Sequence, residues 1–161
     1  MDLQPDQENQ RFSRRVALPD PAATERLGAR IAAGLRIGDA VALEGDLGAG
    51  KTTLARAILR HLGVADAVPS PSFTLVQFYA TARFPVRHYD LYRLRAESEM
   101  EELGLDEALD EGAALIEWPQ RAAAFLPDDA LTVRLEMDDA ARSAILRGPL
   151  RWRELESADV A

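Results

Sequence analysis

The sequence contains no cysteine among its 161 residues. This absence excludes disulfide bonds, thiolate metal sites and a cysteine nucleophile. No apolar run approaches the roughly 20 residues that cross a bilayer, so we expect no membrane contact. The first ten residues, MDLQPDQENQ, are polar and acidic, unlike a secretory signal. Together these features predict a cytoplasmic protein.

Histidine and lysine are also scarce. The two histidines, His61 and His88, lie far apart in the sequence, so no histidine cluster indicates a zinc site. We interpret His88 as a strand residue held in place by hydrogen bonds rather than as a catalyst. Of the 19 basic residues, only Lys51 is a lysine. The net charge is −8, and an acidic protein has no general attraction for nucleic acid, so action on RNA requires a partner.

Hydrophobic periodicity predicts helices that alternate with strands. Asp20 and Pro21 suit the cap and the first turn of a helix, which continues with apolar residues at four-residue spacing. Ser98 and Glu101 have the spacing of a capping box before an acidic helix at 97–111. The other predicted elements are strands at 40–43, 73–79, 84–92, 113–117, 131–137 and 143–148, a turn at 81–83, a helix at 54–62 that Gly63 ends, and a short helix from Pro119.

These elements predict one α/β domain at residues 12–155, with a disordered tail at 1–11 and a C-terminal tail at 156–161. Strands interleaved with helices favour a mainly parallel central sheet with helices on both faces. The hairpins add antiparallel strands to that sheet.

The stretch GDLGAGKT, from Gly45 to Thr52, fits the P-loop signature G-x-x-x-x-G-K-[ST]. It follows the predicted strand at 40–43 and opens a predicted helix, which is the context that this signature requires. Glycines let backbone N–H groups wrap around a phosphate, and the positive end of the helix faces the same phosphate. Thr52 offers a hydroxyl to Mg²⁺. The stretch therefore predicts a P-loop NTPase with a site for a nucleoside triphosphate and Mg²⁺.

Lys51 occupies the lysine position of this signature. A compact ammonium reaches between two phosphates as a point charge, whereas a planar guanidinium is wider and needs a fork-shaped partner. Elsewhere on the surface either cation serves, so a composition bias can replace lysine by arginine there. Guanine-specific P-loop proteins usually read the base with [NT]-K-x-D, which needs a second lysine. The sequence has none, so we expect ATP rather than GTP.

Two acidic residues follow apolar runs and are candidates for the magnesium site. Glu117 ends AALIE, and Asp90 follows FPVRHY. Either carboxylate can hold the metal, directly or through water, or orient the attacking water. Trp118 follows Glu117, and for this residue core packing is an equal alternative to a functional role.

Four segments, in this order and spacing, resemble the bacterial TsaE family, also called YjeE. They are GDLGAGKTTL (45–54), SPSFTLV (70–76), HYDLYRL (88–94) and LIEW (115–118). The similarity runs from about Asp20 to Arg142. The HxDLYRL and IEW segments are not general P-loop features, which makes the resemblance specific.

The resemblance implies roles for individual residues. Lys51, Asp90 and Glu117 take part in catalysis, and Thr52 and Glu117 ligate Mg²⁺. Trp118 lies beside the nucleotide. The phosphates are bound by Gly48, Ala49, Gly50, Lys51, Thr52 and Thr53.

Two further implications of the resemblance concern residues outside the loop. Asp20 and Arg142 lie where family members place groups near the base or the ribose. Ser70 to Thr74 form a switch-like loop near the γ-phosphate. The family usually has SPT where this chain has SPS at 70–72, so Ser72 keeps the hydroxyl and lacks the methyl group.

TsaE proteins are small ATPases required for the threonylcarbamoyladenosine (t6A) modification of tRNA, so the resemblance implies this activity. The partners that it implies are TsaD, which transfers threonylcarbamoyl to the tRNA, and TsaB. It implies contact with tRNA only through that complex. The acidic segment 97–111 is either a surface for a basic partner or a solvated polar face, and the sequence favours the solvated face.

Two other function classes stay open. A P-loop small-molecule kinase needs a lid with arginines, for which Arg93 and Arg95, or Arg83 and Arg87, are candidates; no glycine-hinged lid surrounds them. A non-hydrolysing ATP-sensing switch is the third class. An arginine that assists hydrolysis is Arg93, Arg142 or a residue of a partner, and if a partner supplies it the isolated protein is a slow ATPase.

Overall fold

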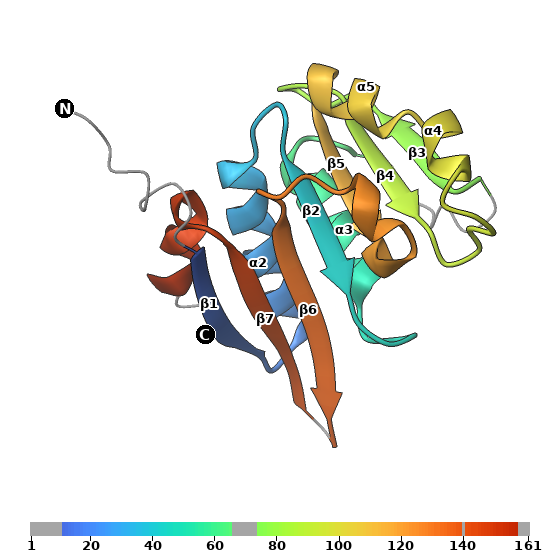
Figure 1. Ribbon diagram of the computed structural model, residues 1–161. Helices are drawn as coiled ribbons and strands as arrows, with labels where there is room; N and C mark the ends of the chain where they lie inside the picture. Colours follow the sequence, from blue (N-terminus) through green and yellow to red (C-terminus); the bar gives the residue numbers. More distant parts are fainter. Residues whose placement is uncertain (1–10, 66–73, 140, 158–161) are drawn as a thin grey trace, which may run out of the picture.

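The computed structural model describes residues 11–65, 74–139 and 141–157. Within them, seven strands form one sheet in the order β1-β7-β6-β2-β5-β4-β3 (Figure 1). The strands are β1 (Arg11–Leu18), β2 (Ala40–Glu44), β3 (Val76–Tyr79), β4 (Val86–Asp90), β5 (Ala113–Glu117), β6 (Leu131–Asp138) and β7 (Ala141–Pro149). The helices are α2 (Pro21–Gly34), α3 (Lys51–His61), α4 (Glu99–Glu102), α5 (Leu105–Glu111) and the 3-10 helices η1 (Pro119–Phe125) and η2 (Leu150–Ser157).

The centre of the sheet is parallel and its margins are antiparallel. β2 pairs in parallel with β5 and β6, and β5 pairs in parallel with β4. β7 and β1 extend one margin and β3 extends the other, all in antiparallel pairing. At the turn before β4, the hydroxyl of Thr81 accepts hydrogen bonds from the backbone N–H groups of Arg83 and Phe84. The predicted α/β architecture with a mainly parallel centre is confirmed.

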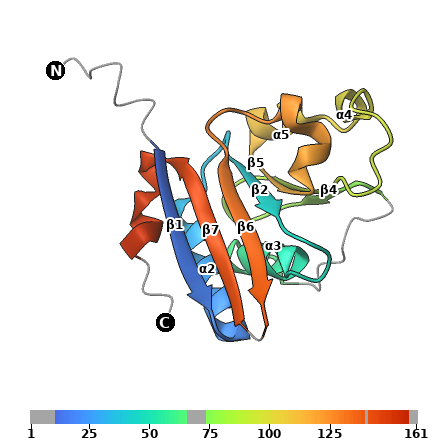
Figure 2. The same ribbon diagram turned by 60° about the horizontal axis from the view of Figure 1, so that its bottom comes forward.

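Helices cover both faces of the central strands β2 and β5 (Figures 1 and 2). α2 and α3 share one half of the core with Val41 and Leu43 of β2 and Leu115 of β5. α4, α5 and η1 share the other half with Ala114 and Ile116 of β5. Because both faces of β2 and β5 are buried, these strands are continuous apolar runs in the sequence, as strands of parallel sheets usually are.

Helix α2 begins where the sequence predicts. Oδ1 of Asp20 accepts a hydrogen bond of 2.8 Å from the backbone N–H of Ala23, and Pro21 occupies the first turn. Leu27 and Ile31 have no exposed surface. The cap and the apolar stripe together fix where this helix begins and which face it turns to the core.

Strand β1 was not predicted. Its first residue, Arg11, falls in the predicted tail at 1–11, and residues 1–10 lie outside the described part of the chain. Phe12 and Val16 are buried in the core, but exposed arginines between them interrupt the alternation of apolar and polar residues. The pattern therefore did not indicate a strand.

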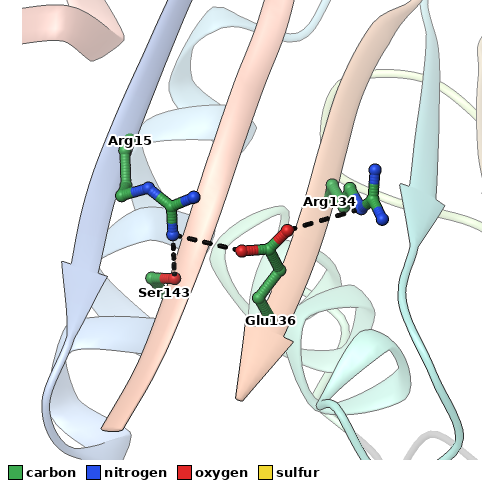
Figure 3. Close-up of polar contacts among 4 residues, drawn as sticks. All are labelled: Arg15, Arg134, Glu136 and Ser143. Carbon is green, nitrogen blue, oxygen red and sulfur yellow. Dashed lines mark hydrogen bonds and ion pairs between the residues drawn. The ribbon is translucent and has the colours of Figure 1, made fainter. Parts of the chain in front are cut away.

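Polar side chains connect β1 to its neighbour β7 and, across β7, to β6 (Figure 3). Nη1 of Arg15 donates to Oε2 of Glu136 at 3.1 Å and to Oγ of Ser143 at 3.0 Å. Nε of Arg134 lies 3.6 Å from the other oxygen of Glu136. Exposed pairs of this kind contribute little to stability, but charged side chains at the margin of a sheet discourage pairing with another chain.

The acidic segment differs from the prediction. The predicted single helix at 97–111 is divided into α4 and α5, because Gly104 adopts a left-handed conformation with φ of 64°. Ser98 makes no side-chain capping bond. Instead, Oε1 of Glu99 accepts hydrogen bonds from the backbone N–H groups of Arg95 and Ala96. A carboxylate one residue later satisfies amides ahead of α4, so the predicted capping box is wrong.

Several element ends also differ from the predictions. β3 begins at Val76 rather than at residue 73, which lies outside the described residues, and β4 ends at Asp90 rather than at residue 92. β6 and β7 are longer than predicted, so the link at 138–142 is shorter. The first two residues of the predicted tail at 156–161 belong to η2. Across the described segments, every helix is too short or too polar to cross a membrane.

Candidate functional site

The carboxyl ends of three parallel strands meet beside the glycine loop. In the register of the sheet, Leu43 of β2 lies opposite Glu117 of β5, and Glu117 lies opposite Asp90 of β4. The loop at 45–50 connects the end of β2 to the start of α3. Asp90 and Glu117 are 6% and 2% exposed. The sheet therefore places both candidate carboxylates at the edge where ligands of such folds bind.

The loop requires glycine for its backbone conformation. Gly45, Gly48 and Gly50 have φ of 142°, 81° and 108°, which residues with a Cβ rarely adopt. A Cβ on Gly45 would also lie 2.7 Å from the carbonyl oxygen of Leu135. The dihedral angles disfavour residues with a Cβ at all three positions, and at Gly45 the lack of space excludes one as well. Gly45 and Gly50 are the two glycines that the phosphate-binding signature fixes.

A cavity of about 340 Å³ opens beside this loop. Its lining residues are Leu47, Gly48, Gly50, Lys51, Thr52, Thr53, Asp90, Glu117, Trp118 and Arg142. All of them except Leu47 are residues that the sequence had placed in a nucleotide site. Of the other candidates, Ala49 and Asp20 do not line the cavity. Residues 70–73 of the predicted switch-like loop lie outside the described part of the chain.

Lys51 is buried, with 5% of its surface exposed. Its ammonium donates to the carbonyl oxygen of Gly45 and, at 3.2 Å, to that of Asp46. The same Nζ lies 3.8 Å from the ring centroid of Trp118, a cation–π contact. Burial lowers the pKa of Lys51 from its usual 10.5, while the charges of Glu117, Asp90 and Asp46 act to raise it.

The carboxylate of Glu117 is held at both oxygens. The hydroxyl of Thr52 donates to Oε1 at 2.8 Å, and Nε2 of His88 lies 2.6 Å from Oε2. His88 has no exposed surface. The interpretation of His88 as a strand residue held by a hydrogen bond is confirmed, but its partner is the candidate metal ligand, which the sequence did not indicate.

These donors fit a magnesium ion that is shared with a triphosphate. Mg²⁺ prefers oxygen ligands, and protein sites usually supply one or two carboxylates while phosphates and waters complete the octahedron. The Thr52 hydroxyl, the Glu117 carboxylate and the neighbouring Asp90 carboxylate provide such ligands. Among the described residues, no group of three or more His, Cys, Asp or Glu side chains is arranged to hold a metal without such help.

Trp118 has an unusual backbone conformation at the end of β5. Its φ of 57° is left-handed, which is an outlier for a bulky residue and occurs mainly where the surrounding structure imposes it. The ring packs against Tyr92 with centroids 5.0 Å apart, and Lys51 contacts it as described above. Trp118 therefore lies in the cavity wall as well as packing on the core, and the sequence did not indicate the contact with Tyr92.

Of the three remaining candidates for the nucleotide site, Arg142 lines the cavity, whereas Asp20 and Ala49 do not. Arg142 lines the cavity, and its Nη1 lies 3.6 Å from where a Cβ on Gly50 would be. Asp20 instead caps α2 through its bond to Ala23. Ala49 is 6% exposed, and its side chain packs into the core from within the loop.

Two of the four arginines considered for a kinase lid have structural partners elsewhere. The guanidinium of Arg83 donates to the carbonyl oxygens of Ala32 and Leu35 at 2.6 and 2.5 Å, where α2 ends. Arg87 donates to the carbonyl oxygen of Gly104 at 2.9 Å. None of the four arginines is among the residues that line the cavity. The geometry therefore gives no support to an arginine lid within the described residues.

Comparison with known proteins identifies the family. A family model described as "Threonylcarbamoyl adenosine biosynthesis protein TsaE" matches residues 18–145. The chain belongs to the TsaE family. The TsaE of Rickettsia felis is 43% identical over 77% of this chain and 73% of its own length, and that of Bacillus subtilis is 39% identical over 71% and 72%. Both are named tRNA threonylcarbamoyladenosine biosynthesis proteins.

A solved structure supports the same assignment. The crystal structure of Bacillus subtilis YdiB matches with a TM-score of 0.76 and 28% identity, over 94% of this chain and 96% of that chain. The sheet of this TsaE-family chain therefore has the fold of the P-loop proteins. The match to the family model leaves out most of β1 and all of η2, while the match to the solved structure covers nearly the whole chain.

Proposed function

We propose that this chain binds Mg·ATP and hydrolyses it slowly, as part of the t6A modification of tRNA in the cytoplasm. The observation that carries the proposal is the hydrogen bond of 2.8 Å between Thr52 and Glu117. It joins the first turn of the P-loop helix to the end of the strand beside Asp90. A triphosphate seated on the glycine loop would meet a hydroxyl and two carboxylates there, which is the donor set of P-loop hydrolases.

In this proposal the chain positions phosphates with its backbone and one cation. The N–H groups of the glycine loop and the start of α3 point to the phosphates. Lys51, whose ammonium contacts the carbonyl oxygens of Gly45 and Asp46 and the ring of Trp118, would supply the cation for the phosphates. A magnesium ion held by Thr52 and Glu117 would neutralise the charge that develops on the phosphates. Asp90 and Glu117 orient a water against the γ-phosphate.

The partners in this proposal are TsaD and TsaB, which the family resemblance implies. An acidic chain with a net charge of −8 does not hold tRNA by itself. We therefore expect it to act on tRNA only through the TsaD–TsaB complex. We also expect the complex to accelerate hydrolysis, since P-loop hydrolases are slow without the group that completes their site.

The two alternative functions predict different results. A small-molecule kinase releases little phosphate without its acceptor. A non-hydrolysing switch binds ATP and releases no phosphate with or without TsaD–TsaB. Phosphate release that needs no acceptor and rises with TsaD–TsaB is the result that the proposed function predicts.

The test is a titration of the purified protein with Mg·ATP, combined with phosphate release in the presence and absence of TsaD–TsaB. Glu117→Gln is expected to keep nucleotide binding, because the loop amides remain. It should reduce hydrolysis by about 100-fold or more, the usual contribution of a positioned acid or base. Glu136→Gln on the open sheet face is the matched control and should behave like the wild type. Failure of Mg·ATP to bind even with TsaD–TsaB would refute the proposal.

Lys51→Arg tests the interpretation of the single lysine. The wider guanidinium does not fit between the phosphates, so we expect Lys51→Arg to lose activity as fully as Lys51→Ala. An active Lys51→Arg variant would show that charge alone is needed at this position.

A further inference from the structure

One buried histidine contacts the carboxylate that is proposed to hold the metal. His88 lies in β4 with no exposed surface, and its Nε2 is 2.6 Å from Oε2 of Glu117. The other oxygen, Oε1, accepts a hydrogen bond from the hydroxyl of Thr52. A strand on one side and a helix on the other therefore fix the two oxygens separately.

The contact determines which imidazole nitrogen carries a proton. An ionised carboxylate only accepts hydrogen bonds, so Nε2 of His88 is the donor to Glu117. Within the described residues, Nδ1 of the same ring is buried without a hydrogen-bond partner. A buried polar atom without a partner costs about 1–3 kcal/mol, whereas an apolar side chain would fill the same space without that cost. Packing alone therefore does not account for a histidine here.

We propose that His88 is a positioning residue that orients Glu117 for the magnesium ion. This inference rests on the proposed Mg·ATP function. The hydrogen bond from Nε2 fixes Oε2, and Oε1 then faces the hydroxyl of Thr52, the second proposed ligand. The last torsion of a glutamate is broad, so without this bond the carboxylate can rotate. Glu117 is 2% exposed, and water does not readily replace the lost donor.

The experiment compares two substitutions of the same ring. His88→Leu fills the space and removes the donor, whereas His88→Gln places an amide N–H₂ near the position of Nε2. Tyr89→Phe is the matched control, because it removes a hydrogen bond of 3.0 Å to the carbonyl oxygen of Leu103 from the next residue of the same strand. Nucleotide binding is measured as a function of Mg²⁺ concentration and also in excess EDTA, and thermal unfolding reports whether each variant is folded.

We expect His88→Leu to raise the Mg²⁺ concentration for half-maximal effect by about 10–100-fold, the usual effect of removing a group that orients a metal ligand. Binding in EDTA should be unchanged, which a general loss of structure would not produce. His88→Gln should restore the Mg²⁺ dependence, and Tyr89→Phe should leave it unaltered. If His88→Leu does not fold, His88→Asn replaces it, because its shorter amide does not reach Glu117.

The outcomes separate this inference from the proposed function. A wild-type protein without Mg²⁺-dependent nucleotide binding overturns the proposed function itself. A wild type that binds Mg·ATP, together with donor-free variants of unchanged Mg²⁺ dependence, overturns only the role of His88. Equal losses in His88→Leu and His88→Gln also overturn it, because the ring rather than the donated hydrogen bond would then be what matters.

Discussion

Lys51 is a cation that the fold keeps largely out of water. Two carbonyl oxygens and the face of Trp118 take the place of its hydration shell. These contacts replace only part of the hydration of the ammonium, so burial still disfavours its charged form and lowers the pKa of Lys51. The residue that the proposed function needs is thus one that the folded protein holds at a cost in stability.

Lys51→Met tests that cost. Below the lowered pKa of the folded protein the penalty is fully present, and it disappears as the pH rises towards the usual value of 10.5 for the unfolded chain. We therefore expect the variant to unfold at a higher urea concentration than the wild type near neutral pH. Its advantage should shrink in alkaline buffer, while Mg·ATP no longer stabilises it.

The measurement is urea unfolding of both proteins across this pH range. Burial raises the pKa of Tyr79 and Tyr89, which lowers the stability of both proteins at alkaline pH and cancels in the comparison. Equal unfolding midpoints near neutral pH would contradict a penalty at Lys51.

Asp20 has two assigned roles, a helix cap in the structure and a contact to the base or ribose by family resemblance. Asp20→Ala removes the acceptor for Ala23 and should cost about 1 kcal/mol. Asp20→Asn keeps a capping oxygen and should preserve the melting temperature. Differential scanning calorimetry measures the cap, and nucleotide titration of Asp20→Asn tests the second role. Stability lost equally in both variants would contradict the capping role.

The role of a single residue can be predicted from the sequence when that role depends on its neighbours along the chain. The glycine loop and Lys51 belong to one signature, and Asp90 and Glu117 each follow an apolar run. The contact of His88 with Glu117 depends on the register of β4 against β5, which brings residues 29 positions apart together. No local pattern contains that register, so the contact could not be predicted.

Helices α2 and α3 approach each other closely at one glycine. A Cβ on Gly28 would lie 2.5 Å from Cβ of Ala57 and 3.0 Å from its backbone carbonyl carbon. Glycine inside a helix is unfavourable by about 1 kcal/mol relative to alanine, so the close packing of α3 accounts for its presence.

Gly28→Ala is accordingly expected to destabilise the protein despite its better helix propensity. Overpacking of this kind costs about 1–3 kcal/mol, which exceeds or cancels the gain in propensity. Urea unfolding measures the change. In an Ala57→Gly background the same substitution should be much less harmful, and an equal cost in both backgrounds would show that the contact is not responsible.

Element prediction succeeded where burial on both faces or a cap dominated the pattern. The start of α2, the buried strand β5 and the end of α3 before Gly63 follow the sequence closely. It failed where a conformation is set at one residue or by distant strands. Gly104 divides the acidic segment, and β1 exists because it pairs with β7 along its whole length.

The 3-10 helix η2 packs against helix α2 and the strands β1 and β7 at one margin of the sheet. Trp152 of η2 is 3% exposed and lies against Gly34 at the end of α2, with Cζ3 2.7 Å from where a Cβ would be. Arg151 adds an ion pair to Asp39. This segment therefore joins the edge strand and helix α2 into the same core.

Trp152→Ala should lower the unfolding free energy by about 3–5 kcal/mol, as large-to-small changes of buried aromatic residues do. Trp152→Phe keeps a ring and removes the indole N–H, which has no hydrogen-bond partner within the described residues, so it should cost less. Chemical denaturation measures both. Unfolding of only one part of the sheet in Trp152→Ala would contradict a single cooperative core.

The overall architecture was predictable because strands that alternate with helices and a P-loop leave few topologies. The charge distribution was visible in the sequence as well. Residues 97–111 contain eight acidic and no basic side chains, so this segment has a net charge of −8. Because the whole chain also has a net charge of −8, the acidic and basic residues outside the segment balance. The antiparallel margin of β1 and its covering helix were not predictable, since they arise only when the two ends of the chain come together.

Because Lys51 is the only lysine in the sequence, reagents that are specific for lysine can react with the chain at one defined side chain. Endoproteinase Lys-C has one internal target and divides the polypeptide into 1–51 and 52–161. Amine-acylating reagents find one ε-amine, inside the cavity and 5% exposed. Because Lys51 is buried, the rate of cleavage or acylation at this residue measures how often the phosphate loop opens.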